Sequence, residues 1–217
     1  MNAIVIFAKY PAPHRVKTRL GAQIGYEPAA DLYRLFIEQT LAVARRSGVE
    51  RIFLACDPKE RQDDFRKMFA GEWTGFLQQG DDLGMRMDNA FQLAFSQGMQ
   101  KVVIIGSDSP TLPTQHLTSA FEVLENHDIA LGPAEDGGYY LIGLQTSHPQ
   151  LFKDIEWSSA SVLPATRERA KRLRLSCALL PTWYDVDEIG TLKRAANDDA
   201  TGMIEKYLQN HTAISFD

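Results

Sequence analysis

The sequence lacks several features that would assign a protein to a class at once. Only two residues are cysteine, Cys56 and Cys177, and neither a CxxC pair nor a regular cysteine spacing occurs. A disulfide-stapled secreted domain and a cysteine-based zinc site are therefore excluded. No apolar run approaches the roughly 20 residues that span a membrane. Neither the GxxxxGK[ST] phosphate loop nor the GxGxxG dinucleotide fingerprint is present, so any nucleotide must be bound in another way.

Positive charge is also scarce. The formal net charge is -5 at pH 7, whereas proteins that bind nucleic-acid phosphates depend on clustered Lys and Arg, so we expect no nucleic-acid partner. The apolar run after Met1 has neither a basic leader nor a cleavage site, and we interpret it as a first strand. These absences predict a cytoplasmic protein that works without a membrane, with a single domain over 1–217.

Short apolar runs and amphipathic stretches alternate along the chain. The apolar runs suit strands buried on both faces, and they cover 3–8, 51–55, 101–105, 129–131, 137–144 and 176–180. The helical spacing of apolar residues predicts helices over 28–47, 82–97, 114–126, 162–173, 189–196 and 203–210, the third of them capped by Thr114. This alternation predicts an α/β fold, namely a three-layer α/β/α sandwich around a mostly parallel, mixed sheet. The run over 137–144 follows a short loop and is the candidate antiparallel strand.

A carboxylate follows one of these runs directly. The segment G-S-D-S-P places Asp108 just past the carboxyl end of the strand over 101–105, where ligands gather in open α/β sheets. Gly106 and Ser107 keep the approach narrow, and Pro110 fixes the next turn. A carboxylate held in this way suits a hard cation such as Mg²⁺ or Mn²⁺ that it shares with substrate phosphates. A cap of the following turn explains Asp108 by itself equally well.

Two more acidic segments are candidates for the same crevice. W-Y-D-V-D-E carries Asp185 and Asp187 after an apolar strand, and we expect only one of the two to face the crevice because one residue separates them. A cap and first turn for the next helix is the simpler explanation of this segment in isolation. Asp136 precedes Gly137 and Gly138, which would let backbone approach a ligand closely, although a Gly-Gly pair is also a common turn.

The loop after the first strand concentrates positive charge in this acidic chain. Lys9, Arg15, Lys17 and Arg19 fall within residues 9–19. Cations at the carboxyl end of the first strand, opposite Asp108, suit a bound diphosphate or triphosphate. A solvated loop with no specific role is the alternative. The prolines and glycine of this loop favour a fixed shape and hence the phosphate-binding interpretation.

Five motifs occur in an order that resembles one family. They are F-A-K-Y-P-A-P-H-R-V-K-T-R-L, Q-G-D-D-L-G-M-R-M, G-S-D-S-P-T-L, G-P-A-E-D-G-G-Y-Y-L-I-G-L and D-V-D-E, and the likeness covers 3–195. They resemble the DUF2064 family of GT-A-fold, nucleotide-diphospho-sugar-transferase-like proteins. These are described as predicted glycosyltransferases and are similar to molybdopterin and phospholactate guanylyltransferases. This chain departs from the pattern at His14, where glycine is usual, and in D-V-D-E-I-G-T-L, which lacks the usual Thr-Pro.

The resemblance implies roles for the residues of these motifs. The implied catalytic residues are Lys17, Asp108 and Asp136, and the implied ligands of Mg²⁺ or Mn²⁺ are Asp108, Asp187 and Asp185. The implied nucleotide-binding residues are Ala8, Lys9, Arg15, Lys17, Arg19, Gln79, Gly80, Leu83, Gly84, Arg86 and Ser107. Gly137, Gly138 and Tyr139 would face the second substrate.

The implied activity is a metal-dependent transfer from a nucleotide sugar to a small-molecule acceptor. The alternative is nucleotidyl transfer from a nucleoside triphosphate to a small phosphorylated substrate, with release of pyrophosphate, and a non-catalytic nucleotide-binding module is a third hypothesis. Both reactions develop negative charge on phosphate oxygens, which a metal ion with Arg and Lys stabilises. The sequence therefore leaves the choice between them open, along with the base, the sugar, the acceptor and a homodimer.

Overall fold

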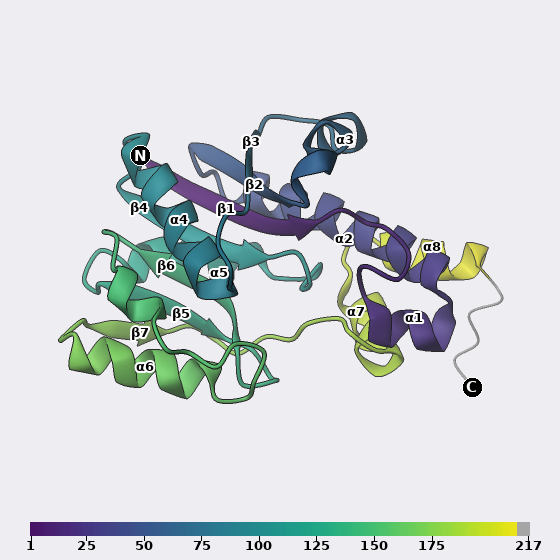
Figure 1. Ribbon diagram of the computed structural model, residues 1–217. Coiled ribbons are helices and arrows are strands. Elements are labelled where there is room, and N and C mark those ends of the chain that lie inside the picture. Colours follow the sequence, from purple (N-terminus) through teal and green to yellow (C-terminus); the bar gives the residue numbers. More distant parts are fainter. Residues whose placement is uncertain (212–217) are drawn as a thin grey trace.

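The computed structural model describes residues 1–211 and confirms the three-layer α/β/α architecture (Figure 1). Within that range seven strands form one sheet in the order β3-β2-β1-β4-β6-β5-β7. The strands are β1 (Asn2–Lys9), β2 (Arg51–Asp57), β3 (Thr74–Leu77), β4 (Lys101–Gly106), β5 (Ile129–Pro133), β6 (Tyr139–Leu144) and β7 (Cys177–Leu179). Neighbouring strands are parallel except where β6 pairs with β4 and β5. The sheet is therefore mixed, with β6 as its antiparallel strand.

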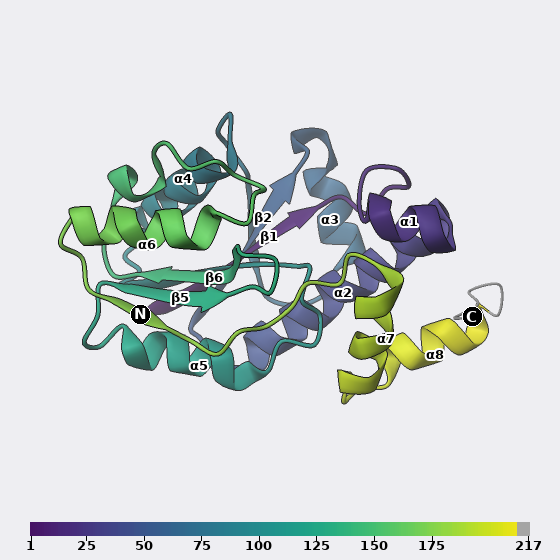
Figure 2. The same ribbon diagram turned by 90° about the horizontal axis from the view of Figure 1, so that it is seen from below.

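Helices cover both faces of this sheet (Figure 2). One face carries α2 (Tyr26–Arg46), α3 (Gln62–Met68), α5 (Thr114–Val123), α7 (Ile189–Asp198) and α8 (Met203–Asn210). The other carries α4 (Leu83–Ser96), α6 (Val162–Arg172) and the short helix η2 (Pro149–Phe152). Two further short helices, α1 (Thr18–Ile24) and η1 (Lys59–Arg61), lie in the loops that follow β1 and β2. No helix in residues 1–211 is both long and apolar enough to cross a membrane.

The central strand β1 shows why its sequence is apolar throughout rather than alternating. Ile4 and Ile6 pack into the core that includes α2, whereas Ala3 and Val5 pack into the core that includes α4. All four side chains are fully buried, because helices cover each face of a parallel sheet. Burying a large aliphatic side chain such as Ile4 contributes about 1.5–3 kcal/mol. This burial fixes the strand, and with it the position of the loop that β1 leads into.

Most of the predicted elements are present, and the differences have local causes. The antiparallel strand over 137–144 is confirmed as β6. The prediction that Thr114 caps its helix is wrong, because Pro113 holds the cap position and no side chain caps α5. The short elements α1, α3 and β3 were not predicted, since the apolar periodicity of so few residues is too weak to identify them.

Candidate active site

The candidate site lies at the edge of the sheet where β1 and β4 end. Parallel strands bring their carboxyl ends to the same edge, so the β1–α1 loop meets the segment after β4 (Figure 1). The chain that leaves β7 returns to this edge before it enters α7. There the backbone N–H of Val186 donates a hydrogen bond of 2.9 Å to the carbonyl of Asp108. Three segments far apart in sequence are thus fixed against one another.

A buried ammonium group joins two aspartates at this point. Nζ of Lys17 lies 2.5 Å from Oδ1 of Asp108 and 2.9 Å from Oδ1 of Asp187. The Lys17 side chain is 2% exposed, whereas those of Asp108 and Asp187 are 46% and 44% exposed. Within residues 1–211, no hydrogen bond is made by the second oxygen of either carboxylate. We call these three residues the Lys17 clamp: its cation is buried, and its two carboxylates each keep one oxygen for a ligand.

The electrostatics of the clamp follow from this burial. Desolvation by itself would lower the pKa of Lys17, but the charges of Asp108 and Asp187 outweigh it and hold that pKa above its ordinary value. Lys17 is therefore charged throughout the physiological range. Its single positive charge offsets one of the two carboxylate charges that it contacts.

The backbone and the helix beneath hold Lys17 in place. Lys17 stands just before α1 in the left-handed conformation, with φ 46° and ψ 44°, which costs a non-glycine residue on the order of 1 kcal/mol. Its ammonium lies 5.8 Å from the centre of the Tyr33 ring and 5.9 Å from that of Phe36, both in α2. Tyr33 in turn shares a 2.7 Å hydrogen bond with Ser107 and accepts one of 3.1 Å from the N–H of Lys9. Tyr33 thus ties α2 to the ends of β1 and β4.

Asp185 is a third carboxylate beside the clamp. Its Oδ1 accepts a 2.6 Å hydrogen bond from the hydroxyl of Ser109. Burial, reinforced by the charge of Asp108, raises the pKa of Asp185 to about 6. Our expectation that only one of Asp185 and Asp187 faces the crevice is wrong. Residues two apart in an extended chain point to the same side, while Val186 between them is fully buried.

The helix-cap interpretation of this acidic segment holds for a different residue. Glu188 is the N-cap of α7 and forms a capping box with Thr191. The Thr191 hydroxyl also accepts a 3.1 Å hydrogen bond from the backbone N–H of Asp187. The side chain of Asp187 is therefore not used for capping, and it turns to Lys17 instead. The cap explains why Asp187 stands at a fixed position.

The other cations of the first loop face solvent. Lys9, Arg15 and Arg19 are exposed, and none of them forms an ion pair within residues 1–211. Arg19 belongs to α1 rather than to an irregular loop. His14 occupies the left-handed region with φ 61°, and its ring stacks on Tyr26 with centroids 3.8 Å apart. The chain thus keeps the turn that glycine usually makes, at the expense of some backbone strain.

The segment before α4 is shaped mainly by packing. Gly80 has φ 135°, and its carbonyl accepts a 3.1 Å hydrogen bond from Nε of Arg86. Leu83 is 42% exposed and remains accessible to a ligand. Gly84 is buried, and a Cβ there would lie 2.6 Å from the ring of Trp157. This glycine therefore makes room for an indole ring, and its expected contact with the nucleotide stays a prediction.

Three other expected contact residues pack against the protein to different degrees. Ala8 and Ser107 are fully buried, and the Ser107 hydroxyl donates to the carbonyl of Phe7 at 3.1 Å. The Tyr139 ring packs into the core around α4, with its hydroxyl 3.9 Å from Sδ of Met87, and burial raises its pKa. The side chains of Ala8 and Ser107 thus face the interior, whereas Tyr139 is half-buried, and the expected ligand contacts of all three stay predictions. Gln79 is exposed, as a ligand contact requires.

Asp136 lies in the turn between β5 and β6, apart from the clamp. Its carboxylate is exposed and accepts a 2.8 Å hydrogen bond from the N–H of Gly138. Gly137 has φ 92°, and a Cβ there would lie 2.5 Å from the carbonyl oxygen of Ala160. Glycine is therefore required at position 137 by the backbone conformation and by the close approach of Ala160. In the part of the chain that the structure describes, no hydrogen bond or ion pair connects Asp136 to Lys17.

The donor set of the clamp fits a hard divalent cation only in part. Residues 1–211 contain no group of three or more His, Cys, Asp or Glu residues arranged to hold a metal ion. Mg²⁺, however, usually takes one or two carboxylates and completes its shell with substrate phosphates and water. The free oxygens of Asp108 and Asp187 supply that minimal set. The site therefore fits an ion that arrives with a phosphorylated ligand.

Comparisons with known proteins identify the family and the fold. The model of a family described as an uncharacterized protein conserved in bacteria (DUF2064) matches residues 40–159. A provisionally assigned nucleotide-diphospho-sugar transferase from Desulfovibrio desulfuricans G20 is 36% identical over 98% of this chain and 96% of that one, with a TM-score of 0.90. No curated protein matches the chain. The expected nucleotide-diphospho-sugar transferase type of fold is thereby confirmed.

Two more distant structures share the fold alone. A nucleotidyl transferase from Methanothermobacter thermautotrophicus is 13% identical, with coverage of 97% and 99% and a TM-score of 0.62. A CMP:2-keto-3-deoxy-manno-octonic acid synthetase in complex with CTP is also 13% identical, with coverage of 93% and 99% and a TM-score of 0.56. The same architecture thus carries proteins named for nucleotidyl transfer.

Proposed function

Since this chain belongs to the DUF2064 family, we propose that it is a metal-dependent transferase that takes a nucleotide-activated donor, and that this donor is a nucleotide sugar. The observation that carries the proposal is the Lys17 clamp, with one buried cation and two half-exposed carboxylates at the ligand-binding edge of the sheet. The 36% identical relative from Desulfovibrio desulfuricans supports the nucleotide sugar as donor.

The residues of the clamp would act on the diphosphate of the donor. Asp108 and Asp187 would hold Mg²⁺ or Mn²⁺, which when bound supplies positive charge to the leaving diphosphate. Lys17 would stabilise the same negative charge from within the protein, since it stays protonated. Arg15 and Arg19 would bind the phosphates from the solvent side.

Two groups remain candidates for the proton transfer that an acceptor hydroxyl requires. Asp136 is exposed at the same edge of the sheet, and we keep it as the proposed general base. Burial and the charge of Asp108 raise the pKa of Asp185 to about 6, toward the range that suits a general base, but its burial beside Asp108 gives an acceptor less access. An Asp136→Asn variant should therefore lose transfer to the acceptor while its affinity for the donor is unchanged.

One observation favours nucleotidyl transfer as a second candidate. Lys9, Arg15 and Arg19 are exposed and make no ion pair within residues 1–211. Three free cations beside the clamp suit the larger charge of a nucleoside triphosphate. In that case a phosphate of the second substrate would attack the α-phosphorus, and pyrophosphate would leave.

The geometry gives less support to a nucleotide-binding module without turnover. Such a module would be favoured if the partner acids pointed away from Asp108. Instead Asp187 shares Lys17 with Asp108, and the charge of Asp108 acts on Asp185. A cytoplasmic location stays a prediction.

The experiment that tests the function is a thermal-shift panel followed by product analysis. The protein is heated with nucleotide sugars and nucleoside triphosphates, each with and without Mn²⁺. Stabilisation by a nucleotide sugar that needs Mn²⁺, with release of a nucleoside diphosphate in the presence of an acceptor, supports the first proposal. Stabilisation by a triphosphate with release of pyrophosphate supports the second. Absence of any ligand-dependent shift would refute both.

A matched pair of variants then links turnover to the clamp. Asp108→Asn removes one of the two half-exposed carboxylates and should abolish metal-dependent turnover while the fold is retained. Asp63→Asn is the control, because Asp63 is exposed on α3. Turnover that survives in the Asp108 variant would contradict the assigned site.

A further inference from the structure

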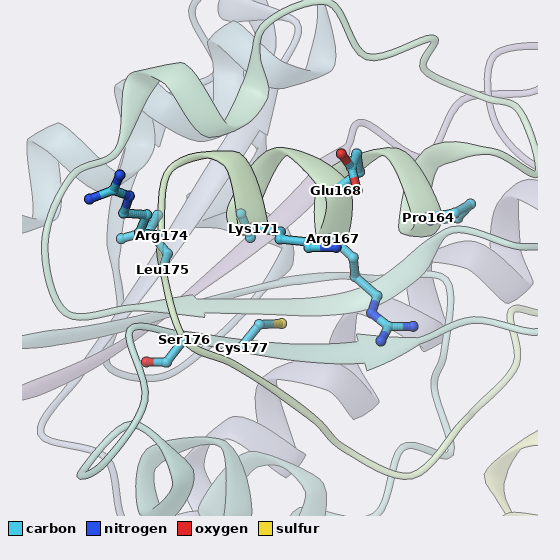
Figure 3. A pocket seen from close by; sticks show the side chains of 9 residues that line it. Pro164, Arg167, Glu168, Lys171, Arg174, Leu175, Ser176 and Cys177 are labelled. Atoms are coloured by element: carbon cyan, nitrogen blue, oxygen red, sulfur yellow. The ribbon is translucent and has the colours of Figure 1, made fainter.

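A groove separate from the clamp runs between α6 and the last strand of the sheet (Figure 3). Its volume is about 610 Å³, and it lies at the opposite end of the molecule from α1 (Figures 1 and 2). Pro164, Ala170, Leu175 and the half-buried Cys177 give it an apolar lining. Nothing in the proposed transferase reaction uses this groove.

The groove carries positive charge that is not neutralised. Arg167, Lys171 and Arg174 line it, and none of them forms an ion pair within residues 1–211. The one acid of the lining, Glu168, pairs instead with Arg172 at 3.2 Å. Figure 3 shows the Arg167 guanidinium reaching toward β7 and Glu168 on the other side of the helix.

The spacing of two of these cations gives them a common direction. Arg167 and Lys171 are four residues apart within α6, so they lie on one side of the helix, about 6 Å apart along its axis. These two side chains form a short row along the groove, and Arg174 follows beyond the end of α6, where its backbone is left-handed with φ 59°. This row is unusual in a chain whose net charge is -5.

Beside this row, the sheet presents a free edge. β7 is the last strand of the sheet and pairs only with β5 in the described part of the chain. The N–H of Leu180 donates to Leu131, and the carbonyl of Ser176 accepts from Ile129. Because backbone groups alternate along a strand, the N–H and C=O groups of Cys177 and Leu179 point away from β5. Such an edge can pair with another extended chain.

We propose that this groove binds an acidic, extended segment of a partner protein, which adds as a further strand beside β7. Its backbone would pair with the free edge, and every second side chain would face α6, so carboxylates at those positions would reach Arg167 and Lys171. The methylene groups of the same acidic side chains would lie against the apolar lining and the 46% exposed Leu179.

The positive charge of the groove and the free edge of β7 together favour an acidic peptide over a second copy of this chain or a nucleic acid. A second copy that paired β7 with β7 about a twofold axis would bring the two rows of cations together, which charge repulsion disfavours. A nucleic acid would use the cations but not the hydrogen-bonding edge or the apolar lining. The acidic peptide alone uses all three features.

The test is fluorescence anisotropy with a labelled peptide of alternating glutamate and valine. Wild-type protein should bind it, and binding should weaken at least about tenfold in an Arg167→Glu/Lys171→Glu variant, since two attractive charges become repulsive. The control is Arg46→Glu/Lys153→Glu, which changes the net charge equally at two exposed sites and should bind like wild type. Unchanged melting temperatures would show that both variants are folded.

Two further probes separate strand addition from charge attraction. The same peptide N-methylated at alternate amides keeps its carboxylates but cannot pair as a strand, so its binding should be lost. Amide hydrogen exchange at Cys177 and Leu179 should slow when the unmodified peptide is added. Equal binding of the methylated peptide, tighter binding of oligouridylate than of the peptide, or equal binding to both variants would each overturn the proposal. None of these readouts depends on transferase activity.

Discussion

Replacing Lys17 by methionine tests the central feature of the site, the single buried cation between two carboxylates. Methionine keeps an unbranched apolar stem of similar length, so packing against Tyr33 and Phe36 should persist. What is lost is the charge that lies 2.5 Å and 2.9 Å from Asp108 and Asp187.

The size of the effect follows from the exposure of the partners. Removing one member of a fully buried ion pair costs about 3–5 kcal/mol. Asp108 and Asp187 are 46% and 44% exposed, so water can hydrate the charges left behind, and we expect a loss of only about 1–3 kcal/mol. For a domain of this size that loss lowers the melting temperature by roughly 2–12 °C. The exposed Lys153 provides the control, and Lys153→Met should melt within a degree or so of wild type.

Differential scanning fluorimetry with and without Mn²⁺ then distinguishes charge from packing. In Lys17→Met the two carboxylates lack a counter-charge, so Mn²⁺ should stabilise this variant more than it stabilises wild type. The reasoning is refuted if Lys17→Met melts at the wild-type temperature, or if Mn²⁺ raises both melting temperatures equally.

Three further predictions concern the groups around the clamp. Burial and the charge of Asp108 raise the pKa of Asp185 from 3.8 to about 6, so ionisation of Asp185 destabilises the fold as pH rises through that window. In urea unfolding, the free energy of unfolding of Asp185→Asn should equal that of wild type near pH 4 and exceed it by about 1–3 kcal/mol at pH 7. Equal pH profiles would contradict this. Tyr33→Phe removes two hydrogen bonds and should cost about 1–2 kcal/mol of unfolding free energy, a prediction that fails if the urea midpoint is unchanged. His14→Gly should have a higher melting temperature than His14→Ala, since both lose the ring contact with Tyr26 but only glycine relieves the strain of the left-handed backbone. The reverse order of melting temperatures would exclude backbone strain at this position.

Local patterns were enough to predict the layered fold. The fully buried β1 and β4 are apolar at nearly every position, whereas the covering helices repeat their apolar residues with helical spacing. That contrast distinguishes buried parallel strands from helices without any knowledge of contacts. The short helices α1 and α3 were not predicted, because about two turns of helix are too few to show a clear periodicity of apolar residues.

The candidate site was predictable in its residue types but not in its pairings. The acid after β4 and the basic loop after β1 stand out in the sequence, and the rule for parallel strands sends both to one edge. No pattern in the sequence indicates that Tyr33 and Ser109 support the site, since a hydroxyl on a helix or in a turn has many local partners. Nor does a local pattern indicate how Gly84 and Tyr139 pack, because their neighbours come from distant segments.

The amino-acid sequence by itself therefore determined the α/β architecture, the edge of the sheet at which the candidate site lies and the charges available there, because each depends on nearby residues or on the direction of a strand. Only the tertiary structure decided which charges meet. Lys17 and Asp187 are 170 positions apart, and the ammonium of Lys17 is buried because three segments pack around it. Contacts of that kind depend on the packing of the whole core, which no local pattern encodes.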